Sequence, residues 1–320
     1  MKYIKNMLAS SIIGVFILLF STGIAFAATL NLTDFESFTT GISVDGQGGW
    51  SSASKWDEDI VDYAGNKVWR VSNSVFSTSF GDMPFAPRLG GIVTDSVTNP
   101  VNSLPQYFAG ESSTGAGNAE FFGKFNFKSS TGAPQPGLRI TVSADNGQGG
   151  RQSFFAIEDN GSTGLNVTTF DVLSDGSFDD VSVIATGLSY TDWHSVGVDL
   201  KFVDGLSNDV VRYFVNDSLV HTNTSWEQYY RNYQSTLHPL GVPVQTLLFR
   251  ISSGASGVAG NGFYIDNVQT GIGLFSSGPE SKNDCKDDGW STFSNPTFKN
   301  QGDCVSFVQS NPKAIGNKNK

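Results

Sequence analysis

Hydrophobic and polar residues alternate with a period of two along most of the chain between residues 28 and 275. In three segments apolar side chains occupy every second position, with mostly polar ones between them: 121–127, 138–144 and 196–202. Successive side chains of a β-strand point to opposite faces of its sheet, so this period predicts strands with one buried face. No long stretch of period 3.6 competes with them, and we expect a chain built mainly from β-strands.

Residues that tolerate a positive φ separate these strands. They form four short turn signals: Asp145-Asn146-Gly147, Asp159-Asn160-Gly161, Asp175-Gly176 and Asp204-Gly205. Residues 211–221 have the form of a β-hairpin with Asn216-Asp217 as its turn. Short strands at a spacing of roughly 8–12 residues predict two antiparallel sheets packed as a sandwich, rather than a βαβ fold. The one predicted helical turn is 225–231, with Ser225 as its N-cap.

The second half of this region resembles a known fold family. The sequence Asp192-Trp193-His194-Ser195-Val196, the hairpin 211–221 and the segment 262–268 resemble concanavalin A-like (laminin G-like) jelly rolls of secreted bacterial proteins. The resemblance is good over about residues 190–270, and rests on strand pattern alone before that. It implies an all-β jelly-roll sandwich of two antiparallel sheets. It says little about function, because this fold occurs in lectins, glucanases, lyases and adhesion modules.

The first 27 residues have the features of a secretory signal peptide. Lys2 and Lys5 precede an apolar run over 12–20, and Ala25-Phe26-Ala27 supplies a small-x-small cleavage pattern. An N-terminal membrane anchor is the alternative, but the run is short for a span of about 20 residues. No second apolar run of that length follows. We therefore expect an exported protein, secreted or at the cell surface, without a membrane span in its mature chain.

The charge of the chain argues against a nucleic-acid partner. The sequence holds 20 Lys and Arg against 30 Asp and Glu. Residues 28–275 carry 12 of the basic and 25 of the acidic side chains, a net charge of −13, whereas 276–320 carry 6 and 5, a net charge of +1. Binding to phosphates needs clustered Lys and Arg. The difference between the two parts also suggests two structural units.

No catalytic residues can be assigned from the sequence. A glucanase of the resembled fold would carry a Glu-x-Asp-x-x-Glu strand, and none of the six Glu residues of 28–275 stands in that pattern. Lyases of this fold use Arg, Gln, His and Tyr on the concave face. The chain has only His194, His221 and His238, and we expect His194 to be a hydrogen-bonded structural residue. An enzyme is not supported by these patterns.

A cluster of aromatic and planar polar residues is the best candidate for a ligand-binding surface. Sugars are commonly bound by aromatic rings that stack on the C–H face of a pyranose, with planar polar side chains beside them. The candidate residues are Trp226, Glu227, Tyr229, Tyr230 and Arg231. The alternative is structural: Trp226 and Tyr230, four residues apart on a short helix, would cover one open end of the sandwich.

The two ends of residues 28–275 suggest a structural calcium ion. Several carbohydrate-binding jelly rolls have an N-terminal Phe-Glu and a C-terminal Ile-Asp-Asn, and in them the Glu and the Asp ligate Ca²⁺. By that resemblance Glu36 and Asp266 are the candidate ligands, with oxygen donors that suit this ion. The alternative is that Asp266 caps a turn and Glu36 is a surface charge.

The C-terminal part is expected to be a separate small unit. We predict a linker at 276–284, a motif at 285–308 and a disordered tail at 309–320. In an oxidising compartment Cys285 and Cys304 are expected to form a disulfide bond. The motif resembles a short C-terminal module found on exported prokaryotic proteins of varied architecture.

These features together favour a non-catalytic module that binds a polysaccharide, a cell-surface glycan or another cell-surface ligand, with a structural calcium ion. Two alternatives stay open. One is a divergent polysaccharide-degrading enzyme, a glycoside hydrolase or a lyase, of the same fold. The other is an adhesion or structural protein whose partners are surface proteins.

Overall fold

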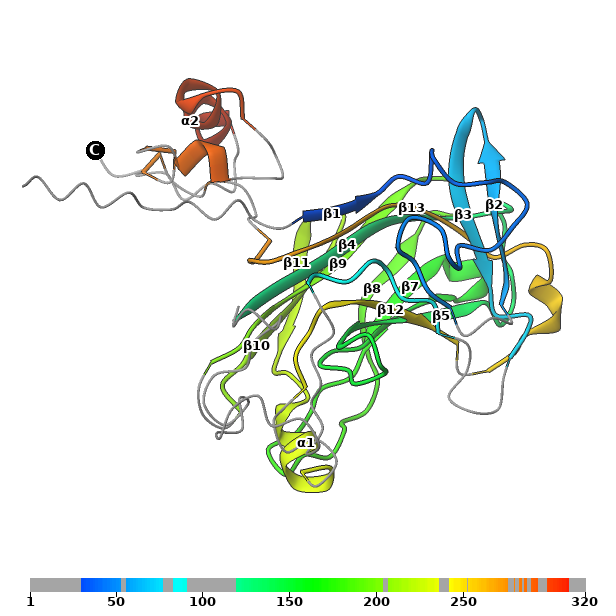
Figure 1. The fold of residues 1–320 in the computed structure, drawn as a ribbon, viewed down its shortest axis with the longest axis horizontal. Coiled ribbons are helices and arrows are strands. Elements are labelled where there is room, and N and C mark those ends of the chain that lie inside the picture. Colours follow the sequence, from blue (N-terminus) through cyan, green and yellow to red (C-terminus); the bar gives the residue numbers. More distant parts are fainter. Residues whose placement is uncertain are drawn as a thin grey trace, which may run out of the picture.

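The computed structural model describes residues 30–52, 56–76, 83–90, 119–203, 207–235, 242–251 and 253–275, together with parts of 279–310. Two antiparallel sheets pack face to face, as predicted (Figure 1). The predicted signal peptide, the predicted tail beyond residue 310 and His238 lie outside the described residues.

Sheet A is the larger sheet, with eight strands in the order β11-β10-β9-β4-β13-β3-β2, and β1 beside β13. Its strands are β1 (Leu30–Thr33), β2 (Asp57–Tyr63), β3 (Asn66–Ser72), β4 (Glu120–Ser129), β9 (His194–Lys201), β10 (Val210–Val215), β11 (Ser218–Asn223) and β13 (Phe263–Gly271).

Sheet B has five strands in the order β12-β5-β6-β7-β8. They are β5 (Arg139–Asp145), β6 (Phe155–Asp159), β7 (Leu165–Thr169), β8 (Ser182–Leu188) and β12 (Thr246–Arg250). Helix α1 (Glu227–Tyr233) lies on the side of sheet B away from sheet A (Figure 1). The short 3-10 helices are η2 (Gly161–Thr163), η3 (Ser256–Val258) and η4 (Gly289–Thr292).

The predicted alternation builds the core between the sheets. On β4 the residues Phe121, Phe125 and Phe127 point inward and are fully buried. Gly123 occupies the remaining inward position of this strand, and a Cβ there would lie 2.5 Å from the side chain of Leu247. The opposing strand therefore comes too close for any larger residue at position 123. Trp69 is fully buried in the core and packs edge-on against Phe249, with ring centroids 5.1 Å apart.

The predicted hairpin is formed by β10 and β11. Its turn residues Asn216 and Asp217 have φ values of 49° and 60°. Both values lie in the left-handed region that a two-residue type I′ turn requires and that Asn and Asp tolerate. The structure thus confirms the predicted hairpin with Asn216-Asp217 as its turn.

Phe275, which follows β13, packs against the outer face of sheet A and holds this part of the chain there. Its ring lies over Gly197, between Phe122 and Phe214 at centroid distances of 5.0 and 5.3 Å. Its backbone N–H donates to Asp199 Oδ2 at 2.8 Å. The buried Asp199 also accepts two hydrogen bonds from Arg212, at 2.9 and 2.6 Å. Burial raises the pKa of Asp199 even though Arg212 acts in the opposite direction.

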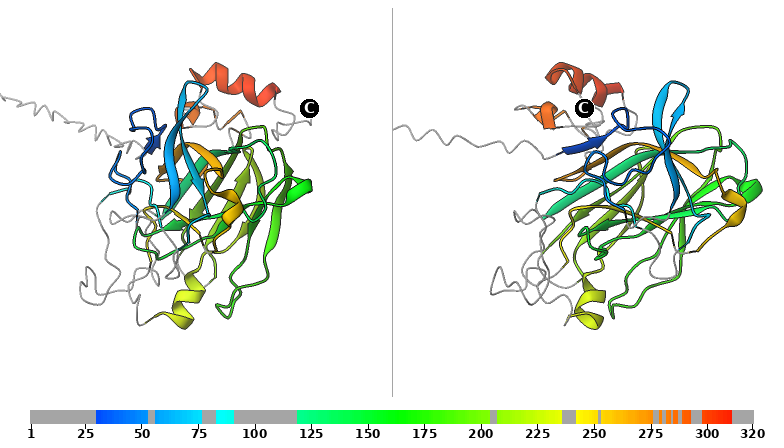
Figure 2. Two further views of the ribbon diagram at one scale, coloured as in Figure 1. Left: turned by 90° about the vertical axis from the view of Figure 1, so that its right-hand side faces the viewer. Right: turned by 45° about the vertical axis from the view of Figure 1, so that its right-hand side comes forward.

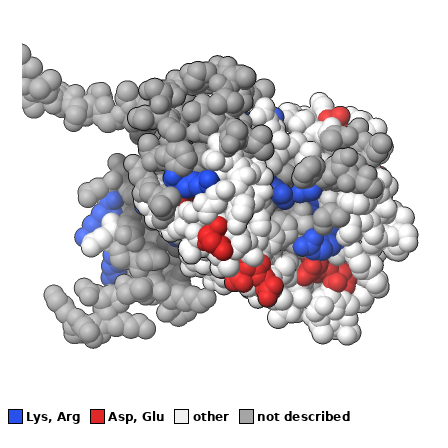
Figure 3. All heavy atoms as spheres, turned by 90° about the horizontal axis from the view of Figure 1, so that it is seen from below, with Lys and Arg blue, Asp and Glu red and all other residues white. Residues whose placement is uncertain are grey.

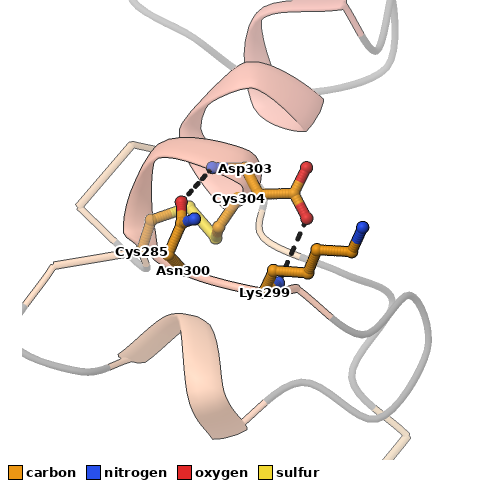
Figure 4. The surroundings of a disulfide bond; sticks show 5 residues. All are labelled: Cys285, Lys299, Asn300, Asp303 and Cys304. Atoms are coloured by element: carbon orange, nitrogen blue, oxygen red, sulfur yellow. Dashed lines mark hydrogen bonds between the residues drawn. A yellow bond between two sulfur atoms is a disulfide. The ribbon is translucent and has the colours of Figure 1, made fainter.

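The predicted disulfide bond joins Cys285 and Cys304 in the C-terminal unit. Cys304 lies in helix α2 (Gln301–Ser310), which extends two residues past the predicted end of the motif. The Asn300 side chain accepts the Asp303 N–H at 2.9 Å, and the Asp303 carboxylate accepts the Lys299 N–H at 3.1 Å (Figure 4). Asn300 therefore caps the first turn of α2, and Asp303 binds the backbone one residue before the cap, so both side chains stabilise the start of the helix.

The C-terminal unit lies on the opposite side of the sandwich from α1. Two further views place α2 beyond sheet A and α1 beyond sheet B (Figure 2). A small apolar cluster of its own surrounds the disulfide, with Trp290, Phe298, Val305 and Val308 as members.

The helices of the described residues are all too short or too polar to span a bilayer.

Candidate functional site: a pocket on the outer face of sheet B

A cavity of about 520 Å³ opens on the outer face of sheet B, beside α1. We call it the α1 pocket. Its size falls within the range of about 300–1,000 Å³ that is typical of small-molecule sites. The described residues that line it are Thr141, Asn146, Gln148, Gly149, Gly150, Arg151, Phe154, Phe170, Phe178, Trp226, Tyr229, Tyr230, Gln234 and Arg250. Figure 3 shows this side of the molecule, where Lys or Arg side chains lie around a hollow.

Strand alternation explains why these sheet residues reach the pocket. Thr141 lies between Ile140 and Val142 on β5, and both of these neighbours are fully buried in the core. Arg250 follows the core residue Phe249 on β12 and is paired with Thr141 in the ladder. Both pocket residues therefore point to the outer face.

Aromatic rings form one wall of the pocket. Phe154 stacks on Phe170 with centroids 4.3 Å apart, and Phe170 stacks on Trp226 at 5.6 Å. Phe178 then packs against Trp226 at 4.7 Å and against Tyr229 at 4.9 Å. This wall joins the residue before β6, the end of β7, the loop after β7 and α1. It presents an apolar surface beside the polar side chains of the pocket, which is the usual composition of a sugar site.

Two arginines line the same cavity. The Arg151 guanidinium lies over the Trp226 ring, 4.9 Å from its centroid, in a cation–π contact. Burial, together with the positive charge of Arg151, lowers the pKa of Arg250 to about 10, while Asp145 acts in the opposite direction. The two positive charges are thus close enough to repel each other.

The buried carboxylate of Asp145 shapes the loop that borders the pocket. Its Oδ1 accepts the backbone N–H groups of Gly147, Gln148 and Gly149, at 2.6, 3.1 and 3.1 Å. Gly147 and Gly149 have φ values of 77° and 93°, which glycine adopts without strain. The other oxygen, Oδ2, is buried and has no partner. Burial raises the pKa of Asp145 to about 7, although these N–H groups and Arg151 oppose the shift.

Tyr230 supports the same loop from α1. Its hydroxyl accepts the Arg151 N–H and donates to the Arg151 carbonyl, both at 2.8 Å. Burial and the nearby Asp145 raise its pKa. Because both hydrogen-bonding capacities of the hydroxyl are used by the backbone, Tyr230 holds the pocket together rather than offering a reactive group.

Three of the five predicted ligand-binding residues line the pocket: Trp226, Tyr229 and Tyr230. The other two, Glu227 and Arg231, do not. Glu227 is fully buried and accepts a hydrogen bond from Arg231 Nε at 2.7 Å, one helical turn away. The structure therefore separates the aromatic members of the predicted cluster from its ion pair.

Helix α1 begins later than predicted and covers a different part of the sandwich. Its first residue is Glu227 and its N-cap is Trp226, whereas we predicted Ser225. The Ser225 hydroxyl still accepts the Glu227 N–H at 3.1 Å, while it donates to the buried Asp209. Trp226 and Tyr230 pack onto the outer face of sheet B through Phe154 and Val242, rather than over an open end between the sheets.

Sequence reasoning missed most of the polar side of the pocket. Asn146, Gln148 and Arg151 follow β5 in a segment interpreted only as a turn, and Arg250 ends a strand whose partner was unknown. The available signal was the polar face of β5, where Arg139, Thr141 and Ser143 alternate with core residues. That face marks the outer side of sheet B, but it does not reveal which distant segments lie over it.

Among the described residues, the histidines have structural partners and do not line the pocket. His194 Nε2 lies 2.9 Å from the Ser189 carbonyl oxygen, in agreement with the expected structural role. His221 Nε2 lies 3.0 Å from Asp171 Oδ1, between β11 and the segment after β7. Neither could assist a reaction in the α1 pocket.

The candidate calcium ligands lie near each other, but a lysine shares their neighbourhood. The negative charge of Glu36 raises the pKa of Asp266, in addition to the larger effect of burial. The Lys67 ammonium donates to the carbonyls of Glu36 and Phe38, at 2.9 and 2.7 Å, and the Lys67 N–H donates to Glu36 Oε1 at 3.0 Å. Asp266 Oδ2 accepts from Asn66 at 3.0 Å.

Binding of Ca²⁺ by Glu36 and Asp266 would require six to eight oxygen ligands around the ion. A cationic nitrogen already binds two of the backbone carbonyls, and the described residues include no group of three His, Cys, Asp or Glu side chains able to hold a metal ion. Calcium binding by Glu36 and Asp266 therefore stays a prediction.

Comparisons with known proteins find similarity in architecture only. No family model and no curated protein matches the chain. Among solved structures, the alginate lyase Aly36B in complex with alginate trisaccharide is 12% identical over 77% of this chain and 98% of its own, with a TM-score of 0.46.

Two further solved structures have lower TM-scores. The carbohydrate esterase of the Shiga toxin-encoding bacteriophage phi24B is 13% identical over 76% of this chain and 100% of its own, with a TM-score of 0.40. The CBM2 module of the Lactobacillus casei BL23 phage J-1 evolved Dit is 9% identical over 77% and 96%, with a TM-score of 0.38. Identities and scores this low assign neither a ligand nor an activity to this chain.

Proposed function

We propose that this protein is exported and binds carbohydrate, and that the α1 pocket is its binding site. The observation that carries the proposal is the composition of the pocket. A continuous aromatic wall faces planar polar side chains, among them Asn146, Gln148 and Gln234, within one cavity of about 520 Å³. A pyranose has an apolar C–H face and a rim of hydroxyl groups, so it matches both parts.

The chemistry of the pocket favours binding over catalysis. Tyr230 is held by backbone groups, and Asp145 is completely buried below the loop that borders the cavity. The described lining residues include no His, Asp or Glu, which leaves Tyr229 as the one described side chain there that could transfer a proton to a bound substrate. A polysaccharide-degrading enzyme and a protein-binding adhesion module are the alternatives that the experiment below must separate from binding.

Two tyrosines of α1 provide a matched test. Tyr229 lines the pocket, whereas Tyr233, one helical turn later, is 60% exposed and does not. We would screen residues 28–320 on a glycan array and measure the affinity of a binding glycan by calorimetry for wild type, Tyr229→Ala and Tyr233→Ala. Loss of one stacking ring is expected to weaken binding about tenfold in Tyr229→Ala, and Tyr233→Ala is expected to bind like wild type.

Each other outcome has a definite meaning. Equal loss in both variants, or no loss in either, would place the site elsewhere on the molecule. A blank array together with capture of a surface protein would favour adhesion. Shortening of the bound glycan during incubation would favour the enzyme.

A further inference from the structure

Three aromatic rings gather on the outer face of sheet A, on the opposite side of the sandwich from the α1 pocket. Tyr63 is the last residue of β2, Tyr264 lies on β13, and Trp193 directly precedes β9. The Tyr63 ring contacts the other two, with centroid distances of 4.8 Å to Tyr264 and 6.2 Å to Trp193. We call these three residues the sheet A platform. They stand far apart in the sequence, and the order of the strands brings them together.

The strand pattern directs these rings away from the core. Tyr264 stands between two buried core residues of β13, and the residue after Trp193 is buried, so alternation turns both side chains to the outer face. Tyr63 reaches them from the β2–β3 hairpin, which rises above sheet A on the side where α2 lies (Figure 1). The hairpin is tied to β13 beside the rings, because Asn66 donates to Asp266 Oδ2 at 3.0 Å. The fold therefore holds the platform in place before any ligand arrives.

Hydrogen-bonding groups that the protein itself does not use surround the rings. Lys128 is the ladder neighbour of Tyr264 on β4, and its ammonium group donates to the Tyr63 hydroxyl at 2.7 Å. No ion pair between described residues includes Lys128. Within the same part of the chain, the side-chain N–H of Trp193, the hydroxyl of Tyr264 and the amide of Asn126 have no hydrogen-bond partner. Each of these groups can therefore bond to a ligand.

This composition fits a sugar better than a protein partner. Protein interfaces have an apolar core with a polar rim around it. On the platform, the ladder neighbours of the two tyrosines are all polar, namely Arg70, Lys128 and Asn66. Trp193 is 38% exposed, so part of its ring surface is available for stacking. Open aromatic surface with hydrogen-bonding groups at its edge matches the apolar C–H face and the hydroxyl rim of a pyranose.

The charges on this face favour an uncharged sugar. Arg70 forms ion pairs with Asp57 and Asp59, at 2.8 and 2.6 Å. Lys128 shares the face with Asp266, a carboxyl group two residues from Tyr264 on β13. Because positive and negative groups lie side by side there, a ligand with a net charge gains little from the platform.

We propose that the sheet A platform is a second carbohydrate-binding site, which takes neutral hexose chains. The rings of Tyr63, Trp193 and Tyr264 contact the C–H faces of the sugars, while Lys128 and Asn126 donate to their hydroxyl groups. This site goes beyond the proposed function and does not depend on the α1 pocket. Because the two sites lie on opposite sheets, one molecule of the protein can bridge two polysaccharide chains.

The test observes the two sites separately in one protein. We would label residues 28–320 with 5-fluorotryptophan and record fluorine NMR spectra, in which each of the six tryptophans gives its own resonance. The variants Trp193→Phe and Trp226→Phe assign the resonances that report on the platform and on the α1 pocket. Cellohexaose, mannohexaose and maltohexaose are then added to millimolar concentration. At least one of them is expected to shift the Trp193 resonance of wild type in a saturable way.

Further variants locate the binding that this resonance reports. Tyr264→Ala is expected to weaken it about tenfold, through loss of one stacking ring. Lys128→Ala is expected to weaken it about fivefold, through loss of a hydrogen bond. Tyr229→Ala in the α1 pocket and the exposed Tyr233→Ala are controls that leave it unchanged. Thermal melts establish that each variant is folded, and the titration of wild type tests the proposal even if a variant is not.

The outcomes separate this inference from the proposed function. A Trp193 resonance that none of the three hexasaccharides shifts would overturn the inference, and so would a shift that disappears in Tyr229→Ala but persists in Tyr264→Ala. If the Trp226 resonance still responds to a glycan in that case, the proposed function of the α1 pocket stands. A response of Trp193 without any response of Trp226 to the same glycans and to those of the array would support the platform and overturn the α1 pocket.

Discussion

Replacement of Asp145 by Asn should remove a large pH dependence of stability from this protein. Asp145 is completely buried, and its pKa is raised from 3.8 to about 7, mainly by burial. Between these two pH values the folded state binds a proton that the unfolded state has lost. Stability therefore falls as pH rises through this window, by about 1.4 kcal/mol per pH unit at most.

The size of the effect follows from the two pKa values. The contribution of Asp145 to the free energy of unfolding should decrease by about 2.5 kcal/mol between pH 5 and pH 8, of a limiting total of about 4 kcal/mol. The Asn oxygen can still accept the N–H groups of Gly147, Gln148 and Gly149, but the side chain does not ionise. Any cost of placing its NH₂ group at the unpartnered Oδ2 position is independent of pH.

The assay is urea unfolding of wild type and Asp145→Asn at pH 5, 6, 7 and 8. The free energy of unfolding of the variant minus that of wild type should rise by about 2.5 kcal/mol from pH 5 to pH 8. Other carboxyl groups with raised pKa values, such as Asp199 and Asp209, contribute equally to both proteins and cancel in this difference. Parallel curves for the two proteins would refute the reasoning, since they would mean that Asp145 ionises normally in the fold.

Two further predictions concern the outer face of sheet A and the candidate calcium site. Gly197→Ala should lower the free energy of unfolding, measured in urea, by about 1–3 kcal/mol, because its Cβ would lie 2.7 Å from the Phe275 ring. Gly257→Ala is the control and should cost much less, because a Cβ at that position would have no other atom within 4 Å. Equal stabilities of the two variants would show that the Phe275 ring does not lie over Gly197. Lys67→Ala should increase the rise in melting temperature that CaCl₂ causes, because it exposes the carbonyls of Glu36 and Phe38 as oxygen ligands. An equal response of the variant and wild type would mean that Ca²⁺ does not use these carbonyls.

The sequence determined the fold class because its signals are local. The period of two on β4 and β9, and the positive-φ residues at Asn216-Asp217, act through neighbouring side chains and backbone angles. For the same reason it identified the aromatic residues of the pocket, Trp226 and Tyr229, which lie within four positions of each other. The disulfide was predictable as well, because the chain has only two cysteines.

The tertiary structure alone decided which of these residues act together. Arg151 and Arg250 are 99 positions apart, and they meet because β12 pairs with β5 rather than with another strand. Glu227 and Arg231 belong to the same sequence cluster as Tyr229, yet a helix turns them toward Asp209 and away from the pocket. Lys67 lies at the predicted calcium site because the β2–β3 hairpin places it beside the segment of Glu36. A sequence pattern records which face of a strand is buried, whereas strand order and the loops that cross a face depend on the packing of the whole chain.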